Sequence, residues 1–390
     1  MEQHEQVRLL KELLRQVADG TTADAGAHFH NPVEVYTDPA IAAAESEKIF
    51  GDYPQILGLS GELPTPGSFV TTEDFGPPVL AVRDDDGVFR AFLNVCSHRG
   101  SVVEPALRGE KSRFSCPFHA WTYSSHGALV GVPRSQHFGE IDRGCHGLVP
   151  LPAAERGGFL WVHPRPDGVL DMEAVLGGIE SDLDTWGWAD YVRVADDTYE
   201  MGLNWKLAMD TFGETYHFDN LHKNTLSKAY FGSIHTSEGF GFNHRLMVCN
   251  RRIESMAEKP EEEWSITTGA FPVYSLFPNV ALTVTSHGVN MLRSYPVPGD
   301  PTRSISRVTY YTDPLVIGIR DSALEERIAI YTAAVRDEDF AIASTSQRGM
   351  ASGAQTHIVF GRNEPGLHHW HKSYRQQMNL KPVEPTPTRT

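Results

Sequence analysis

The sequence has 390 residues, of which 40% are hydrophobic and 22% charged, and this ordinary globular composition excludes a mainly disordered or fibrous protein. Its 34 basic and 50 acidic side chains give a formal net charge of −16, which disfavours nucleic acid and anionic membranes as partners. No apolar run approaches the roughly 20 residues that span a bilayer, and the charged N-terminal stretch is unlike a secretory signal, so we expect a cytoplasmic protein without membrane segments.

The predicted elements change character along the chain. Residues 1–17 predict an amphipathic helix that packs on the body of the protein, since its apolar side chains fall on one face. Short β-type runs broken by turn signals follow from about 65 to 165 and predict a small all-β domain. Beyond it, predicted strands mixed with helical stretches at about 203–218 and 321–347 are typical of an α+β domain.

Two short loops of the predicted β domain each offer one thiolate and one imidazole. Cys96 and His98 form the first pair, and Cys116 and His119 form the second after 17 intervening residues. A structural zinc finger more often groups its cysteines and its histidines separately, whereas one of each per loop lets two thiolates hold one iron and two imidazoles the other. The pattern therefore predicts a Rieske [2Fe–2S] cluster, with a structural zinc site as the alternative.

A second set of metal-binding side chains lies in the segment 204–222. Asp210, Glu214 and His217 are four and three residues apart, which places them on one stripe of a helix. His222 lies about 140° further round, so it can share a metal with His217 only if the helix distorts or ends between them. A cluster that delivers electrons needs an acceptor, and two histidines with one carboxylate are the usual ligands of a non-haem Fe(II) that activates oxygen.

The third ligand of such a site must come from a distant carboxylate, and the predicted helix 321–347 offers Asp337, Glu338 and Asp339. The apolar stripe of this helix puts Asp337 on the far side, whereas Glu338 and Asp339 flank the stripe equally. The stripe consists of Ile328, Tyr331, Val335 and Ile342. Periodicity alone therefore leaves the choice between Glu338 and Asp339 open.

Four segments resemble parts of Rieske non-haem iron oxygenase α subunits, the catalytic subunits of the aromatic-ring-hydroxylating oxygenases. LNVCSHRG and CPFHAWTY are similar to the two cluster-binding loops, and NWKLAMDTFGETYHFDNLH is similar to the catalytic-iron segment. The acid pair Glu338–Asp339 is followed by Gln347 and Gly349, eight and ten residues after Asp339. This pattern resembles the helix that carries the third iron ligand. The resemblance implies the cluster ligands Cys96, His98, Cys116 and His119 and the iron ligands His217, His222 and Asp339.

The resemblance also assigns a role to the acidic residues of the iron segment. In the trimers of this family, a carboxylate joins the second cluster histidine of one subunit to an iron ligand of the next subunit. Here it implies that Glu214 is this catalytic bridge, between His119 and His217. Asp210, one turn earlier, is predicted either to take part in the same catalytic relay or to pair with a nearby base such as Lys206.

The architecture that the resemblance implies is an α+β fold with three parts. Residues 1–37 form the N-terminal helix and a lead-in packed on the catalytic domain. Residues 38–165 form the Rieske [2Fe–2S] β domain. Residues 166–390 form a catalytic domain of the helix-grip type, an antiparallel sheet with helices that binds mononuclear Fe(II).

The expected activity is that of an oxygenase which receives its electrons from elsewhere. The sequence has no GxGxxG dinucleotide fingerprint, so we expect an NAD(P)H-dependent reductase or a ferredoxin as partner. With O₂, the enzyme is expected to hydroxylate, dihydroxylate or oxidatively demethylate a small organic substrate, aromatic or otherwise largely apolar. A homotrimer is expected, with or without a separate β subunit. A non-catalytic Rieske electron carrier and a zinc-binding structural protein are the alternatives.

The segment 223–310 is expected to line the substrate pocket. Its aromatic residues predict either an apolar cavity or a packed core: Phe231, Phe240, Phe242, Phe271, Tyr274 and Phe277. Four basic residues are expected either to recognise a substrate carboxylate or to lie at the surface: His235, His244, Arg245 and Arg293. The C-terminal histidines are expected to be packing or surface residues: His368, His369 and His371.

Overall fold

The computed structural model describes residues 1–286, 288–317 and 321–383, without the side chains of 321–323. The chain forms two compact units. The larger unit consists of Met1–Ser46, Glu173–Trp186 and Val192–Thr390, and the smaller unit consists of Glu47–Met172 and Gly187–Tyr191. Among the described residues, no helix combines the length and the apolar character that crossing a bilayer requires.

The smaller unit is built from three antiparallel sheets, as the turn-rich segment predicted. Phe69 and Phe114 meet edge to face in its core at 5.4 Å between ring centroids. The five-stranded sheet has the order β10 (Pro150–Leu151), β5 (Phe89–Leu93), β4 (Val79–Arg83), β3 (Ser68–Thr72) and β6 (Arg108–Glu110). The three-stranded sheets are β11 (Ala153–Arg156), β12 (Phe159–Val162) and β2 (Gln55–Leu59), and β7 (Arg113–Ser115), β8 (Thr122–Ser124) and β9 (Leu129–Gly131).

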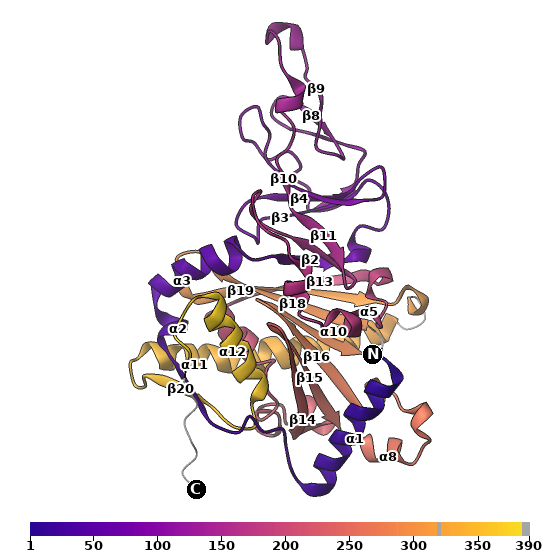
Figure 1. The fold of residues 1–390 in the computed structure, drawn as a ribbon, viewed down its shortest axis with the longest axis vertical. Helices are drawn as coiled ribbons and strands as arrows, with labels where there is room; N and C mark the ends of the chain where they lie inside the picture. The colour runs from indigo at the N-terminus through magenta and orange to yellow at the C-terminus, as the bar shows by residue number, and fades with distance from the viewer. Residues whose placement is uncertain (287, 318–320, 384–390) are drawn as a thin grey trace. The chain divides into compact units, whose positions relative to one another are not determined.

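The larger unit contains one antiparallel sheet of seven strands, with helices packed against it (Figure 1). This arrangement confirms the predicted α+β class with an antiparallel sheet and helices. Its strand order is β13 (Val192–Met201), β19 (Asp300–Thr312), β18 (Gly288–Val297), β17 (Val280–Thr285), β16 (Ala270–Leu276), β15 (Asn243–Asn250) and β14 (Tyr230–Phe240). A separate pair joins β1 (Phe29–Pro32) to β20 (His357–Phe360).

Short and long helices complete the larger unit. The shorter ones are α2 (Glu34–Thr37), α3 (Pro39–Glu45), α4 (Met172–Leu176), α5 (Glu180–Asp184), α6 (Trp205–Asp210), α7 (Phe218–Leu221), α8 (Ile253–Ala257) and α9 (Ile266–Gly269). The longer ones are α1 (Gln3–Asp19), α10 (Asp321–Thr332), α11 (Ala341–Ala351) and α12 (Pro365–Gln377). Helix α1 packs on β14, and α12 packs on β14 and β15.

Helix α1 forms as the apolar pattern predicted and ends at Gly20, whose φ of 63° gives the left-handed turn that glycine adopts without strain. Leu9, Leu10 and Leu13 are fully buried in a cluster with side chains of β14 and β15. Burying three leucines stabilises the docked helix by several kcal/mol in total, at about 1.5–3 kcal/mol each.

The first boundary between the units lies after α3. The carboxylate of Glu45 is buried and accepts hydrogen bonds from Lys206 Nζ at 2.5 Å and from Trp205 Nε1 at 2.9 Å, both in α6. A buried ion pair of this kind holds α3 to the larger unit, because removing either partner would leave a buried charge uncompensated. The smaller unit therefore begins at Glu47, nine residues after the boundary expected at 38.

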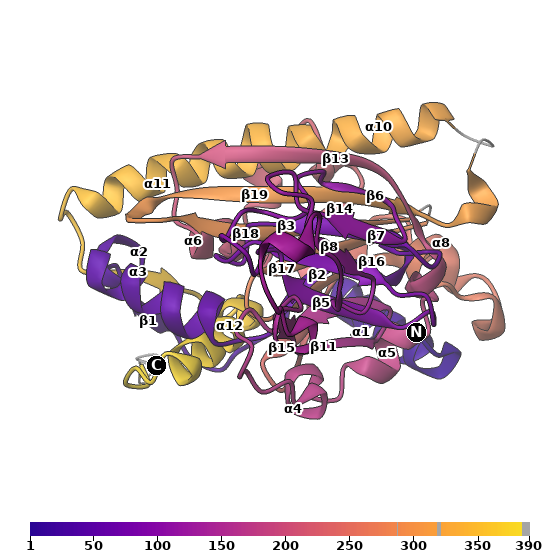
Figure 2. The same ribbon diagram turned by 90° about the horizontal axis from the view of Figure 1, so that it is seen from above.

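Three helical segments of the larger unit run end to end as one long rod beside β13 and β19 (Figure 2). Between α10 and α11 lies the π-helical segment η9 (Ala333–Phe340). The rod packs on the sheet through Tyr331, which meets Tyr310 edge to face at 5.8 Å, and through Phe340, which meets Tyr199 at 6.2 Å. A π-helical turn holds more residues than an α-helical turn, so side chains after it point in different directions from those a regular helix predicts.

Candidate active site

The two cysteine–histidine loops of the smaller unit have matching backbone geometry. Cys96 O accepts the N–H of Gly100, and Cys116 O accepts the N–H of Ala120, each at 2.9 Å. The residue four positions after each cysteine has a positive φ, 74° at Gly100 and 55° at Ala120. Both thiols are buried and free of disulfides. The chain therefore forms two tight loops of similar backbone geometry, and each loop turns around one cysteine sulfur.

The histidines of these loops face one another on the outer side of the unit. The rings of His98 and His119 have centroids 4.6 Å apart, and His98 stacks on Trp121 at 4.9 Å. His98 is half-buried and His119 is exposed. The two sulfurs thus lie inside and the two imidazoles outside, which is the separation that a two-iron cluster with one thiolate iron and one imidazole iron requires.

The donor geometry distinguishes this cluster from a single zinc ion. A tetrahedral zinc ion has bonds of about 2.0–2.3 Å, so its ligand atoms lie within about 4 Å of one another. The described groups of three acidic, cysteine or histidine residues whose ligand atoms lie within 4.8 Å are His217, His222 and Asp339, and Asp84, Asp86 and His126. No cluster-loop residue belongs to either group, so the ligand atoms of these described loops do not converge as those of a single zinc ion would.

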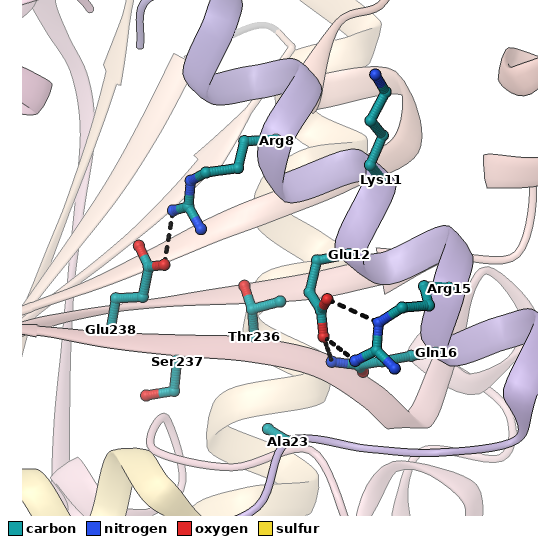
Figure 3. Close-up of a pocket in the computed structure, with 9 residues that line it drawn as sticks. All are labelled: Arg8, Lys11, Glu12, Arg15, Gln16, Ala23, Thr236, Ser237 and Glu238. Atoms are coloured by element: carbon teal, nitrogen blue, oxygen red, sulfur yellow. Dashed lines mark hydrogen bonds and ion pairs between the residues drawn. The ribbon is translucent and has the colours of Figure 1, made fainter.

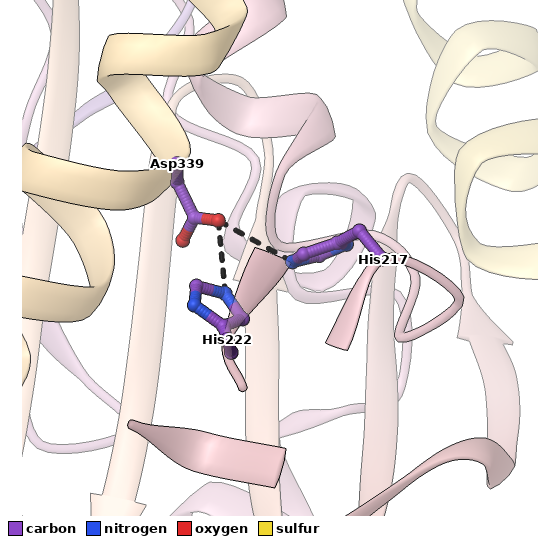
Figure 4. A group of neighbouring side chains, drawn as sticks. All are labelled: His217, His222 and Asp339. Atoms are coloured by element: carbon purple, nitrogen blue, oxygen red, sulfur yellow. Dashed lines mark ion pairs between the residues drawn. The ribbon is translucent and has the colours of Figure 1, made fainter. Parts of the chain in front are cut away.

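The second predicted set of ligands converges in the larger unit (Figure 4). Asp339 Oδ1 lies 3.3 Å from His217 Nε2 and 3.0 Å from His222 Nε2. All three atoms are buried and make no hydrogen bond with the described residues. Burial lowers the pKa of His217, but Glu214 and Asp339 outweigh it and raise the pKa to about 10. Three donor atoms that converge on one another in acidic surroundings fit a mononuclear cation, as in a two-histidine, one-carboxylate iron site.

The two histidines are brought together by a helix of only one turn. His217 immediately precedes α7, and His222 immediately follows it, with φ −89° and ψ 32°. The five-residue spacing therefore works because the helix ends between the two ligands. The predicted helix 203–218 is wrong: α6 stops at Asp210, and the chain then turns, so the acids and His217 do not share one helical stripe.

A glycine in the turn after α6 explains this break. A Cβ on Gly213 would lie only 2.4 Å from Leu367 Cδ2, so any other residue in this turn would displace the Leu367 side chain of α12. Glycine also weakens a helix by about 1 kcal/mol relative to alanine. The turn directs Glu214 and His217 toward the rod that carries Asp339.

In both candidate histidine ligands, His217 and His222, a carboxylate binds Nδ1, the ring nitrogen that faces away from the converging donor atoms. His217 Nδ1 donates to Glu214 Oε1, and His222 Nδ1 donates to Glu338 Oε2 at 2.6 Å. Thr225 Oγ1 donates to the same Glu338 oxygen at 2.5 Å. A carboxylate on Nδ1 fixes the tautomer that leaves Nε2 free to bind a metal. Glu338, the alternative third ligand, therefore lies behind His222, and Asp339 faces both histidines.

Asp210 lies in a separate buried network. Its carboxylate accepts from Tyr36 Oη at 2.6 Å and from His371 Nε2 at 2.8 Å. Asn31 Nδ2 donates to Tyr36 Oη at 3.0 Å and lies 3.2 Å from His371 Nδ1. Asp210 thus pairs with a base, as one expectation had it, but the base is His371 rather than Lys206, whose ammonium group bonds to Glu45. The expectation for His371 missed this role: the side chain is fully buried and hydrogen-bonded rather than merely packed.

A cavity of about 460 Å³ opens onto two of the three converging side chains, His222 and Asp339. His222, Asp339 and Glu214 lie at its wall. Apolar side chains from the sheet and the rod form most of the remaining lining, including Leu246, Val248, Val273 and Val335. Tyr230 and Phe271 also line it and meet edge to face at 4.7 Å. A cavity of this size fits a small organic molecule next to a metal.

Comparisons with known proteins agree with both halves of this arrangement. Residues 54–148 match the family model of the Rieske [2Fe-2S] domain, and residues 188–380 match that of the ring hydroxylating alpha subunit (catalytic domain). The chain belongs to the Rieske oxygenase α subunits. It is a Rieske non-haem iron oxygenase, with a [2Fe–2S] cluster and a mononuclear iron as cofactors.

Several curated members of this family are similar to the chain. The carnitine monooxygenase oxygenase subunit of Acinetobacter baumannii is 24% identical over 354 residues, which cover 89% of this chain and 93% of that protein. Choline monooxygenase of Spinacia oleracea is 28% identical over 349 residues, 87% of this chain and 76% of that protein. The glycine betaine monooxygenase oxygenase subunit of Chromohalobacter salexigens is 34% identical over 200 residues, 50% of this chain and 44% of that protein.

A solved Rieske oxygenase has the same fold. The quaternary ammonium Rieske monooxygenase CntA, in complex with an inhibitor, superposes with a TM-score of 0.78 at 23% sequence identity, over 90% of this chain and 96% of that one. At this identity the superposition establishes the fold, and the chemistry of this oxygenase must come from its own residues.

The oxygenase cavity differs from the lining that the sequence suggested. Of the six aromatic residues named for it, Phe271 lines the cavity, while Tyr274 and Phe277 are buried in the core. None of the four basic candidates is among the lining residues. Arg245 is instead buried in ion pairs with Asp182, Glu5 and Glu238. Sequence reasoning missed Arg327 of α10, which does line the cavity.

A second hollow of about 520 Å³ lies between α1 and β14, away from the metal-binding residues of the oxygenase (Figure 3). Its lining is charged, but the charges bind one another. Arg8 pairs with Glu238 at 2.6 Å, and Arg15 pairs with Glu12 at 2.7 Å. The ion pair between Arg8 and Glu238 therefore helps to hold α1 on the sheet. Because these charged side chains are paired with one another, the hollow is a poor candidate for a ligand site.

Proposed function

We propose that this oxygenase hydroxylates a carbon next to the nitrogen of a small quaternary ammonium compound and thereby removes that carbon from the nitrogen. The single observation that carries the proposal is the cavity of about 460 Å³ whose wall includes His222 and Asp339. A substrate in this cavity lies next to the residues that would hold the iron. The relatives described above are named for carnitine, choline and glycine betaine, which favours a quaternary ammonium compound over the aromatic substrate expected from the sequence.

The lining of the cavity suits a cation with methyl groups. Tyr230 and Phe271 present aromatic surface, and aromatic faces attract quaternary ammonium groups through their quadrupoles. The carboxylates of Glu214 and Asp339 add negative charge at the same wall. An ammonium group near these carboxylates would direct its methyl carbons toward the metal-binding residues.

The overall reaction has a defined balance. One O₂, two electrons and two protons convert a C–H bond next to nitrogen into C–OH, and the second oxygen atom leaves as water. The C–N bond of the hydroxylated product then breaks, and the carbon leaves as an aldehyde with a tertiary amine as the other product. The mononuclear iron, when bound, supplies oxygen activation, and the [2Fe–2S] cluster supplies electrons one at a time.

The proposed roles of the residues follow the geometry. Cys96, Cys116, His98 and His119 hold the cluster, and His217, His222 and Asp339 hold the iron. Glu214 fixes the Nδ1 proton of His217, and its second oxygen accepts the N–H groups of Tyr216 and His217. In this proposal, the same carboxylate joins His217 to the cluster histidine of a neighbouring subunit in a homotrimer. The electrons enter the cluster from a separate reductase or ferredoxin.

The proposal is tested with the reconstituted oxygenase and a surrogate reductase. Carnitine, choline, glycine betaine and naphthalene are supplied in parallel, with NADH consumption, formaldehyde and products by mass spectrometry as readouts. We expect coupled turnover with a trimethylammonium compound and none with naphthalene. His217→Ala should lose iron and product while keeping the cluster spectrum. Turnover of naphthalene alone would contradict the proposal.

A further inference from the structure

Arg327 differs from the other cavity residues because one nitrogen of its guanidinium is hydrogen-bonded and the other two have no partner among the described residues. Its Nη2 donates to Tyr311 O at 3.2 Å and to Thr312 Oγ1 at 3.0 Å, both on β19. Gly288 of β18 makes room for the group, since a Cβ there would lie 2.2 Å from Arg327 Nη1 and 2.1 Å from Tyr311 O. The strands thus hold the guanidinium in one place against their backbone.

The remaining donors of this guanidinium lack acceptors. Nε and Nη1 of Arg327 are buried and have no hydrogen-bond partner among the described residues. Burial lowers the pKa of Arg327, and the group that opposes this effect is Tyr310, which is not an acid at neutral pH. Arginine nevertheless stays protonated in proteins. Arg327 is half-buried, and a partly buried cation without a paired anion is costly, so the site favours a ligand that supplies one.

Asn290 adds a second polar group to the same part of the cavity. It lies on β18 two residues after Gly288, so both residues belong to the same face of the strand. Asn290 is 2% exposed, lines the cavity, and its Oδ1 has no partner among the described residues. A side-chain amide can turn either its oxygen or its NH₂ group toward a ligand. One guanidinium and one amide together suit a monoanion rather than a phosphate.

The anion-binding end of the cavity is remote from the metal-binding end. Arg327 and Asp339 are twelve residues apart on the same helical rod, so their backbones lie at most about 18 Å apart along its axis at 1.5 Å per residue, and closer because η9 is π-helical. Their side chains line one cavity. A substrate that reaches both must therefore be elongated, with its reacting carbon and its anionic group at opposite ends.

We infer that Arg327, supported by Asn290, binds the carboxylate of the substrate at the end of the cavity remote from the metal. The inference deepens the proposed function and rests on it for the cationic end of the ligand. It specifies the substrate as an extended trimethylammonium carboxylate, in preference to an amino alcohol such as choline. The carboxylate accepts from Nε and Nη1, and the ammonium group lies near Tyr230 and Phe271.

The test compares acids with their matched carboxamides, which have nearly the same shape but no charge. The dissociation constants of γ-butyrobetaine and its carboxamide are measured by anaerobic calorimetry on the intact, metal-loaded oxygenase. A charge-assisted hydrogen bond contributes about 1.5–3 kcal/mol, so we expect the wild type to prefer the acid by at least about 10-fold. Arg327→Gln should lose this preference while binding the carboxamide as the wild type does.

A matched control and a second ligand pair make each outcome decisive. Arg348→Gln removes an exposed arginine of α11 outside the cavity and should keep the preference. Hexanoate and hexanamide lack the ammonium group. If neither trimethylammonium compound binds but hexanoate keeps a preference that depends on Arg327, the proposed function fails and the inference stands. If the wild type binds both acids no more tightly than their amides, the inference is overturned and the proposed function is left intact. The same holds if the Arg327→Gln variant keeps the preference for the acids.

The wild-type comparison also covers the case in which Arg327→Gln does not fold. Arg327→Lys then keeps a positive charge at the site, and Asn290→Ala removes the supporting amide without removing the charge. The inference requires the acid preference in the wild type and a smaller preference in Asn290→Ala. Absence of a wild-type preference overturns it whatever the variants do.

Discussion

Glu338 and Asp339 are neighbours in sequence and lie on opposite nitrogens of the same imidazole. Glu338 Oε2 accepts the His222 Nδ1 proton at 2.6 Å, while Asp339 Oδ1 lies 3.0 Å from Nε2. The two carboxylates therefore divide the work: one orients the ring, and the other completes the group of donors that faces a metal.

This division predicts different iron contents for variants of the two acids. Asp339→Ala should lose the mononuclear iron, whereas Glu338→Gln should keep it with an affinity weaker by about 10- to 100-fold. Iron is measured after dialysis against a chelator, with the cluster absorbance as internal reference. Asp337→Ala is the control, because that carboxylate is exposed and pairs with Arg336. Loss of iron from Glu338→Gln equal to that from Asp339→Ala would reverse the two roles.

Glu214 is predicted to matter for electron arrival more than for metal binding. Glu214→Gln should keep cluster and iron but slow single-turnover product formation by about 10- to 100-fold, because the amide is a weaker partner for the His217 Nδ1 proton. Rapid-quench analysis of the reduced enzyme measures the rate. Asp219→Asn changes an exposed acid nearby and should leave the rate unchanged. A near-normal rate in Glu214→Gln would remove this residue from the path between the centres.

Asp210 is predicted to support the structure around the site rather than the transfer of electrons. Asp210→Asn weakens the bonds to Tyr36 and His371 inside the protein and should reduce the free energy of unfolding by about 1–3 kcal/mol. Tyr36→Phe, which removes one hydroxyl, should cost less. Urea unfolding measures both. If Asp210→Asn instead keeps its stability and slows single-turnover product formation, the residue belongs to the relay.

Glu364 predicts a pH dependence of stability. Burial, and then the neighbouring acids Glu214 and Asp210, raise its pKa from 4.5 to about 7, against the hydrogen bond from Gly361 N–H. The native state therefore keeps a proton that the unfolded chain loses, so this residue's contribution to stability falls as the pH rises from about 4.5 to about 7 and is level above that. Glu364→Gln should be more stable than the wild type at pH 8 by about 1–3 kcal/mol and nearly equal to it at pH 4.5. Equal stability at both values would contradict the prediction.

Motifs that act within one short stretch of chain could be predicted from the sequence. The two cysteine–histidine loops need only local turns, and the histidines of the iron segment needed only the helix to end between them. The strands of the α+β domain and the docked N-terminal helix followed from their apolar patterns in the same way, because each pattern has a fixed period. The antiparallel pairing of those strands was implied only by the resemblance.

Features that depend on distant contacts could not be predicted. The periodicity of the rod left Glu338 and Asp339 equivalent because it assumed a regular α-helix, and η9 changes the directions of its side chains. Ile342, placed on the buried stripe, is 50% exposed, while Asp339 is 5% exposed. The partner of Asp210 comes from a residue 161 positions later, His371. Arg327 had no signal in its own neighbourhood, since strands earlier in the sequence fix its guanidinium.

The larger unit is built from stretches of chain that lie before and after the smaller unit in the sequence, and this has a consequence for folding during synthesis. A ribosome completes every strand of the smaller unit by Val162, but Glu45 must wait for Lys206 and Tyr374, and the leucines of α1 must wait for β14 and β15. The N-terminal segment therefore emerges with an apolar face and a carboxylate that have no partners while more than 150 further residues are translated. We expect chaperones to bind this exposed N-terminal segment during that period. Because the chain folds as it is synthesised, the segment should be among the last parts to become ordered.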